Sequence, residues 1–157
     1  MEETQTWRLC DAGAHCELEL DWTLRGLRAI TFGQYPYGGL FVHMPYRAEV
    51  GGTVRTSEGM GFPQAEGQPA RWVALCMPLP GRRGKAGVAM LDHPGNPGHP
   101  VPWRVDHQLG IAPSRCIGGA WHLREGESTT SCYRLYLSCG ATDPQAVEAQ
   151  WRAFAAT

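Results

Sequence analysis

The chain has 157 residues, 43% of them hydrophobic and 18% charged, a composition typical of one globular domain with a sizeable core. Lys and Arg number 14 against 15 Asp and Glu, so the formal net charge is −1. Because no long basic run and no membrane-spanning apolar stretch occurs, this sequence excludes an electrostatic nucleic-acid track and a membrane span.

The first residues are acidic and no apolar segment follows them, so we expect no secretory signal. Six cysteines occur and none forms a Cys-x-x-Cys pair. Without an export signal, these cysteines are expected to be reduced thiols in the cytoplasm.

Short apolar segments separated by glycine and proline predict a series of strands along the chain. Residues 16–24 alternate between apolar and polar side chains, which is typical of a half-buried strand. Residues 71–77 are apolar on both faces, which indicates a central strand. Turn signals at residues 49–52, 80–84 and 124–127 lie between strands. The predicted strands are residues 16–24, 38–44, 71–77, 87–91, 121–123 and 132–138.

Only one segment carries a helix start signal. Asp143 is a suitable N-cap, and Pro144 suits the first helical position. Val147, Trp151 and Phe154 follow at helical spacing, so they form one apolar stripe that packs on a sheet. The sequence therefore predicts a mainly all-β fold: an antiparallel β-sandwich of jelly-roll type with one C-terminal α-helix, as a single domain over residues 1–157.

Residues 92–103, Asp-His-Pro-Gly-Asn-Pro-Gly-His-Pro-Val-Pro-Trp, form a proline-rich loop that carries reactive side chains. His93 and His99 are candidate acid–base residues, and Asp92 and Glu58 are candidate carboxylate partners. With His107, the same two histidines are candidate ligands of a divalent transition metal. The alternative is that these histidines only hydrogen-bond the loop backbone.

A second group of residues is suited to ligand binding. Arg55 lies three positions before Glu58, and this pair holds a polyol or carboxylate unless it is a surface ion pair. Aromatic and arginine side chains in the loops suit sugar rings and other flat molecules, although they also suit core filling. Those side chains are Tyr35, Tyr37, Trp72, Trp103, Arg104 and Trp121, of which Trp103 is the strongest candidate; His43 and Asn96 complete the predicted binding set.

The order of these motifs resembles that of a known family. Tyr-Gly-Gly-Leu at 37–40, Ser-Glu-Gly at 57–59 and Ala-Arg-Trp-Val at 70–73 precede the 87–103 string, and Tyr-Arg-Leu follows at 133–135. Over residues 17–154 this pattern resembles the PmoA-like family that carries a "methane oxygenase" label. The resemblance implies a carbohydrate-like ligand and a sugar-binding supersandwich fold, and the chain corresponds to the C-terminal half of longer members. The family usually has arginine at position 43 and histidine at position 104, where this chain has His43 and Arg104.

The predicted function is that of a small enzyme acting on a carbohydrate-like or polyhydroxylated molecule, of epimerase, lyase or hydrolase type. His93 or His99 moves a proton, and Glu58 or Asp92 assists. In a metal-assisted version of this mechanism, the protein also binds a divalent transition metal. Two alternatives stay open: a non-catalytic small-molecule-binding or accessory protein, and a tailoring enzyme of a biosynthetic pathway. We expect no nucleic-acid or membrane partner, and we expect a homodimer because a half-length sandwich exposes an apolar face.

Overall fold

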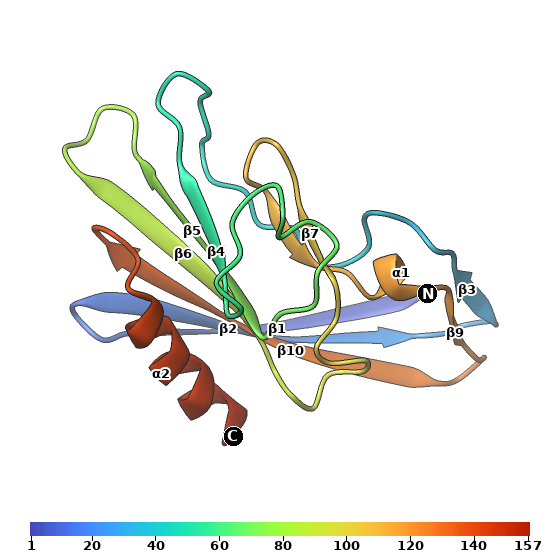
Figure 1. Cartoon of the computed structure of the whole chain (residues 1–157). Coiled ribbons are helices and arrows are strands. Elements are labelled where there is room, and N and C mark those ends of the chain that lie inside the picture. Colours follow the sequence, from blue (N-terminus) through green and yellow to red (C-terminus); the bar gives the residue numbers. More distant parts are fainter.

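The computed structural model describes residues 1–157 and shows a mainly β fold (Figure 1). The strands are β1 (Glu2–Asp11), β2 (His15–Arg25), β3 (Ile30–Phe32), β4 (Thr53–Thr56), β5 (Trp72–Pro78), β6 (Lys85–Asp92), β7 (Trp103–Val105), β8 (Ile111–Pro113), β9 (Trp121–Leu123) and β10 (Ser128–Cys139). The helices are α1 (Arg115–Gly118), which is a single turn, and α2 (Pro144–Ala155).

Six strands form one antiparallel sheet in the order β1-β2-β10-β6-β5-β4. Four shorter strands form two separate ribbons, β3–β9 and β7–β8. Tyr133 of β10 lies opposite both Leu20 of β2 and Asp92 of β6. The start of the proline-rich loop is therefore held beside the centre of the large sheet.

The larger core covers one face of this sheet. Val73, Leu75 and Met77 alternate along β5, and all three are buried on that face. Trp103 of β7 and Ile111 of β8 pack against them from the opposite layer. Burial on both faces of β5 confirms the prediction of a central strand at residues 71–77.

Helix α2 covers the other face (Figure 1). Val147 and Phe154 are buried against Trp72 and Leu91 of the sheet. The backbone N–H of residue 145 donates to Asp143 Oδ1 at 3.0 Å, and proline occupies the first helical position. The predicted capped helix with one apolar stripe is therefore confirmed.

The predicted mainly β, antiparallel architecture with one C-terminal helix is confirmed, and the structure shows how its layers are built. The layer opposite the large sheet consists of the β3–β9 and β7–β8 ribbons together with loops. Residues 38–44 form only an isolated bridge, in which Val42 pairs with Ile111, so the strand predicted there is wrong. Glycines at 38 and 39 and prolines at 36 and 45 interrupt regular pairing. Strand β1, which the sequence pattern did not indicate, forms the exposed edge of the sheet.

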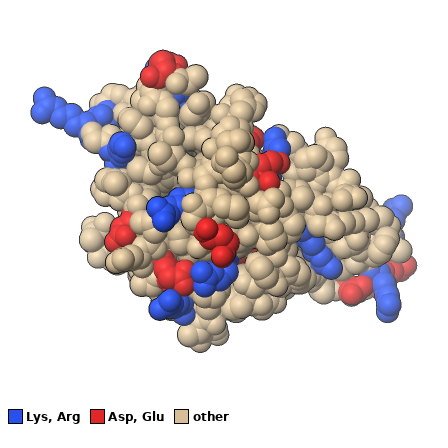
Figure 2. All heavy atoms as spheres, viewed as in Figure 1, with Lys and Arg blue, Asp and Glu red and all other residues tan.

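Charged side chains are spread over the surface. On the face shown in Figure 2, Lys and Arg alternate with Asp and Glu and form no continuous basic track. The mixture of charges on this face agrees with the near-zero net charge. None of the helices combines the length and the apolar character needed to cross a membrane.

Candidate functional site

The proline-rich loop is fastened to strand β10 by one asparagine. Asn96 Nδ2 donates to Asp92 Oδ1 and to the backbone oxygen of Cys132, each at 2.7 Å. The backbone N–H of Cys132 donates in return to Asn96 Oδ1 at 2.7 Å. Both Asp92 and Asn96 are buried, so these bonds form in a site shielded from water and fix the loop where it leaves β6.

His99 lies on the other side of the same carboxylate. Its Nδ1 is 2.7 Å from Asp92 Oδ2, and its side chain is 11% exposed. The imidazole stacks on Trp151 of α2 at 6.3 Å between ring centroids, and Trp151 Nε1 donates to the backbone oxygen of Asp92 at 2.9 Å. Asp92 therefore orients the imidazole, in the manner of carboxylates that hold a histidine in one tautomer.

Burial shifts the protonation equilibria of two groups in this site. The pKa of Asp92 is raised above its ordinary value, chiefly by desolvation, although hydrogen bonds from Asn96 and His99 oppose the shift. The pKa of Tyr133 is also raised, first by burial and then by the neighbouring charge of Asp92. Tyr133 therefore keeps its proton and is available as a hydrogen-bond donor at neutral pH.

A pocket lies beside this network, at the end of the large sheet where β3, β9 and α1 cover β2 and β10. It encloses about 150 Å³ and is partly open. We call it the aromatic pocket. Its lining residues are Met1, Trp22, Leu24, Phe32, Gly38, Gly39, Asp92, Asn96, Pro97, Val101, Pro113, Arg115, Cys116, Trp121, Thr129, Ser131 and Tyr133.

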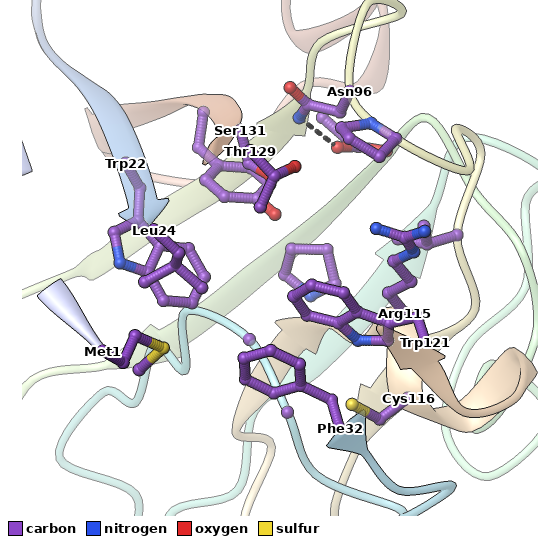
Figure 3. Close-up of a pocket in the computed structure, with 17 residues that line it drawn as sticks. Met1, Trp22, Leu24, Phe32, Asn96, Arg115, Cys116, Trp121, Thr129 and Ser131 are labelled. Carbon is purple, nitrogen blue, oxygen red and sulfur yellow. Dashed lines mark hydrogen bonds between the residues drawn. The ribbon is translucent and has the colours of Figure 1, made fainter. Parts of the chain in front are cut away.

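Aromatic rings form two opposing walls of the pocket. Trp121 stacks on Phe32 with ring centroids 3.8 Å apart and an interplanar angle of 7°. The guanidinium of Arg115 lies 4.5 Å from the centre of the Trp121 ring. Figure 3 shows Trp22 and Leu24 across the cavity from this stack. The spacing leaves room for a flat or ring-shaped ligand between apolar faces.

Polar groups line one end of the pocket. Thr129, Ser131 and Tyr133 occupy alternate positions of β10, so their side chains share one face of the sheet. Figure 3 places Thr129, Ser131 and Asn96 at the end away from Phe32. Hydroxyl and amide groups at this end can orient a ligand whose ring lies between the aromatic walls.

The structure brings three of the predicted site residues into one network, places the predicted aromatic residue Trp121 in the adjacent pocket, and separates the rest. Asp92, Asn96 and His99 form one network, and the first two line the aromatic pocket. His93 lies elsewhere: its Nδ1 accepts the Gly95 N–H at 3.0 Å and its ring packs on Phe154 of α2. For His93, the hydrogen bond with Gly95 agrees with the alternative in which the loop histidines only bond the loop backbone.

The predicted metal site is not assembled. His107 lies exposed in a turn, away from the network of His99 and Asp92, and His93 packs on α2. No group of three or more His, Cys, Asp or Glu side chains is placed to hold a metal ion. The structure therefore does not bring His93, His99 and His107 together as ligands of one metal ion.

The carboxylate of Glu58 and the guanidinium of Arg55 lie outside the aromatic pocket. Glu58 Oε1 is 3.9 Å from Arg71 Nε and makes no contact with Asp92 or His99. Arg55 lines an open, charged hollow between β4 and α2. The prediction that Glu58 and Arg55 act together with the proline-rich loop is therefore corrected, because both residues lie in a surface region distinct from the aromatic pocket.

Three further predicted binding residues are also placed away from the pocket. Trp103 has no exposed surface, and its Nε1 donates to the backbone oxygen of Ala70 at 2.8 Å, so it is a core residue. Arg104 donates to Glu66 and, at 3.0 Å, to the hydroxyl of Tyr37. His43 is exposed and lines a separate apolar hollow.

Sequence reasoning missed most of the pocket. Ser131 and Thr129 precede Tyr133 at alternate positions of β10, so extending the strand predicted at 132–138 backwards would have found the polar row. Trp22 belonged to a predicted strand and was not singled out. Arg115 had no local signal, because only the packing of α1 beside Trp121 brings it into the pocket.

Comparisons with known proteins give one match. Residues 1–152 match the family described as "Family of unknown function (DUF6807)". No curated protein matches the chain, and no solved structure matches it. The match spans nearly the whole chain, including the strands, the loop and most of α2. The chain therefore belongs to DUF6807.

Proposed function

We propose that the protein is an enzyme that binds one ring of a carbohydrate-like molecule in the aromatic pocket and acts on it by acid–base chemistry. The observation that carries this proposal is the stack of Trp121 on Phe32, which faces Trp22 across a cavity with hydroxyl groups at one end. Sugar rings present apolar C–H faces to aromatic walls and hydroxyls to polar groups, so this arrangement suits their chemistry.

The size of the pocket limits the ligand. Its volume of about 150 Å³ is similar to that of an engineered cavity that holds one benzene ring, also about 150 Å³. A single six-membered ring therefore fits the enclosed part, and its substituents reach towards the opening. Resemblance of the 87–103 string to the PmoA-like family also supports a carbohydrate-like ligand, by analogy alone.

The proton chemistry is assigned to the groups at the polar end. Asp92 is the only carboxylate on the wall, and its raised pKa brings it closer to the range in which a carboxyl group exchanges protons at neutral pH. His99 bonds the oxygen of Asp92 that Asn96 leaves free, and Tyr133 donates to an oxygen of the ligand. Epimerisation, elimination and hydrolysis each require such an acid–base group, so the proposal keeps these reaction types.

A second candidate is non-catalytic binding of the same ligand class. It is favoured by one observation: both oxygens of Asp92 are bonded within the protein, and the Asp92 side chain is 1% exposed. In that case the network only holds the loop that shapes the pocket. A tailoring role in a biosynthetic pathway is compatible with either candidate.

Self-association is also proposed, through the exposed apolar side chains near the β1 edge. Trp7, Leu9 and Leu137 are 40%, 73% and 39% exposed, and they share one face of the large sheet. Covering such side chains favours a homodimer. All six cysteines are unpaired, which supports a reducing compartment such as the cytoplasm.

Binding and turnover variants test the enzyme proposal together. We would titrate the protein with neutral and acidic monosaccharides and follow ligand turnover by NMR in D₂O, where epimerisation by proton transfer introduces deuterium at carbon and elimination removes a carbon-bound proton signal. Trp121→Ala is expected to abolish binding, whereas Phe62→Ala, which removes an exposed aromatic ring outside the pocket, is expected to leave it unchanged.

Asp92→Asn separates the two candidates, because it keeps the shape of the side chain and removes its acid–base function. Binding without turnover in this variant, with turnover in the unchanged protein, supports the enzyme. Binding in both proteins with turnover in neither supports the non-catalytic candidate. Absence of any binding, or equal loss in Trp121→Ala and Phe62→Ala, contradicts both.

A further inference from the structure

We propose that the ligand of the aromatic pocket carries an oxyanion, a carboxylate or a phosphate, and that Arg115 binds it. This inference rests on the proposed carbohydrate-like ligand and narrows its class to acidic sugars or sugar phosphates. The structural basis is the position of one guanidinium on the pocket wall that has no anionic partner in the protein.

Arg115 differs from the other arginines that are at least partly buried. Four arginines belong to this class, and in a partly buried position a guanidinium loses solvation that a carboxylate normally replaces. Three of them have such a partner: Arg71 pairs with Glu148, Arg104 with Glu66, and Arg134 with Glu19. Arg115 makes no ion pair and no side-chain hydrogen bond, so its donors are available to a ligand.

The surroundings of Arg115 hold it in place and keep it unneutralised. Its guanidinium stacks on Trp121, which itself stacks on Phe32, so the group is oriented without the use of its N–H donors. Asp92 is the only acidic residue on the wall, and its two oxygens already accept from Asn96 and His99. No carboxylate of the pocket is therefore placed to neutralise the arginine.

A second unpaired donor lies in the same wall. Trp121 Nε1 is buried and has no hydrogen-bond partner within the protein. Figure 3 shows the Arg115 guanidinium between Trp121 and Asn96, at the side of the cavity where a substituent of a bound ring would extend. Planar guanidinium groups bind carboxylates and phosphates through paired N–H donors, so an oxyanion on the ring would pair with the Arg115 guanidinium.

The test compares matched ligands by isothermal titration calorimetry. The probes are hexoses of gluco, galacto and manno configuration, the corresponding hexuronates, and the corresponding hexose 6-phosphates. For the configuration that binds, we expect an anionic form to bind at least about tenfold more tightly than the neutral hexose, which corresponds to about 1.4 kcal/mol. The tighter of the two anions identifies carboxylate or phosphate as the recognised group.

Arg115→Gln removes the charge and is expected to reduce the ratio of anionic to neutral affinity to less than about threefold. Arg28→Gln, a change at an exposed arginine outside the pocket, is expected to keep the full preference.

Equal affinities for neutral and anionic forms, or an unchanged preference in Arg115→Gln, would overturn this inference. If the neutral hexose still binds and Trp121→Ala still weakens it, the proposed function stands without the anion. If no probe of any set binds, the proposed function fails and the inference fails with it.

Discussion

Replacing Asn96 by alanine is expected to destabilise the protein strongly, because one side chain makes three short hydrogen bonds in a buried site. Each of the three bonds, two from Nδ2 and one to Oδ1, is 2.7 Å long. Leaving a buried polar partner unsatisfied costs about 1–3 kcal/mol, so three affected partners give a loss of about 3–9 kcal/mol. A domain of this size has about 5–15 kcal/mol of total stability, so the variant should lose a large part of its free energy of unfolding.

Asn96→Asp gives a sharper version of the same test. The new carboxylate still accepts from the Cys132 N–H, but the two hydrogen bonds that Asn96 Nδ2 donates are lost, and the carboxylate lies beside Asp92. Two carboxylates that share a buried site cannot both ionise at low cost. We therefore expect the loss relative to the unchanged protein to be larger at pH 7 than at pH 4, where a shared proton restores one donor.

Urea unfolding at pH 4 and pH 7, followed by far-UV circular dichroism, measures both effects. Gln108→Ala is the control, because this exposed side chain makes no hydrogen bond and should change the free energy of unfolding by less than about 0.5 kcal/mol. A loss below about 1 kcal/mol for Asn96→Ala would refute the buried network. Equal losses for Asn96→Asp at the two pH values would also refute it.

Three further predictions follow from individual groups. Because the folded-state pKa of Asp92 is raised, its stabilising contribution is present below the unfolded pKa and is lost as pH rises through the folded pKa. The free energy of unfolding should therefore fall less from pH 4 upwards in Asp92→Asn than in the unchanged protein, as urea titrations across that range would show. Burial and the nearby Asp21 raise the pKa of Cys132 to about 11, so at pH 8 mass spectrometry should find it alkylated more slowly than exposed Cys10; equal rates would contradict the burial. Asp143→Ala should lower the free energy of unfolding by about 1 kcal/mol through loss of the α2 cap, and an unchanged thermal midpoint would count against that cap.

Local sequence patterns predicted the elements that carry their own periodicity. Residues 71–77 are apolar throughout and form the central strand β5, and the capped stripe from Asp143 forms α2. Strand β1 has few apolar positions because both of its faces are exposed at the sheet edge, so hydrophobic periodicity could not reveal it. Pairing with β2 specifies β1, and pairing partners are not visible in a local window.

The candidate site also combines residues that local sequence patterns reveal with residues that only tertiary contacts bring together. Asp92, Asn96 and His99 lie within eight residues of one loop, and local chemistry was enough to select them. The pocket depends on contacts across the chain, since Tyr133 meets Asp92 only through the pairing of β10 with β6. Trp103 was selected for its place at the end of the loop, but full burial makes it a core residue, and burial depends on tertiary packing.

The central claim is that a carbohydrate-like ring binds between Trp22 and the stacked Trp121, and indole NMR signals test it most directly. With ¹⁵N-labelled tryptophan, each indole N–H gives one signal that single Trp→Phe variants assign. Addition of a bound monosaccharide is expected to shift the signals of Trp22 and Trp121 and to leave that of Trp7, on the exposed edge strand, in place. A ligand that binds without shifting either pocket signal, or that shifts Trp7 alone, would contradict the account.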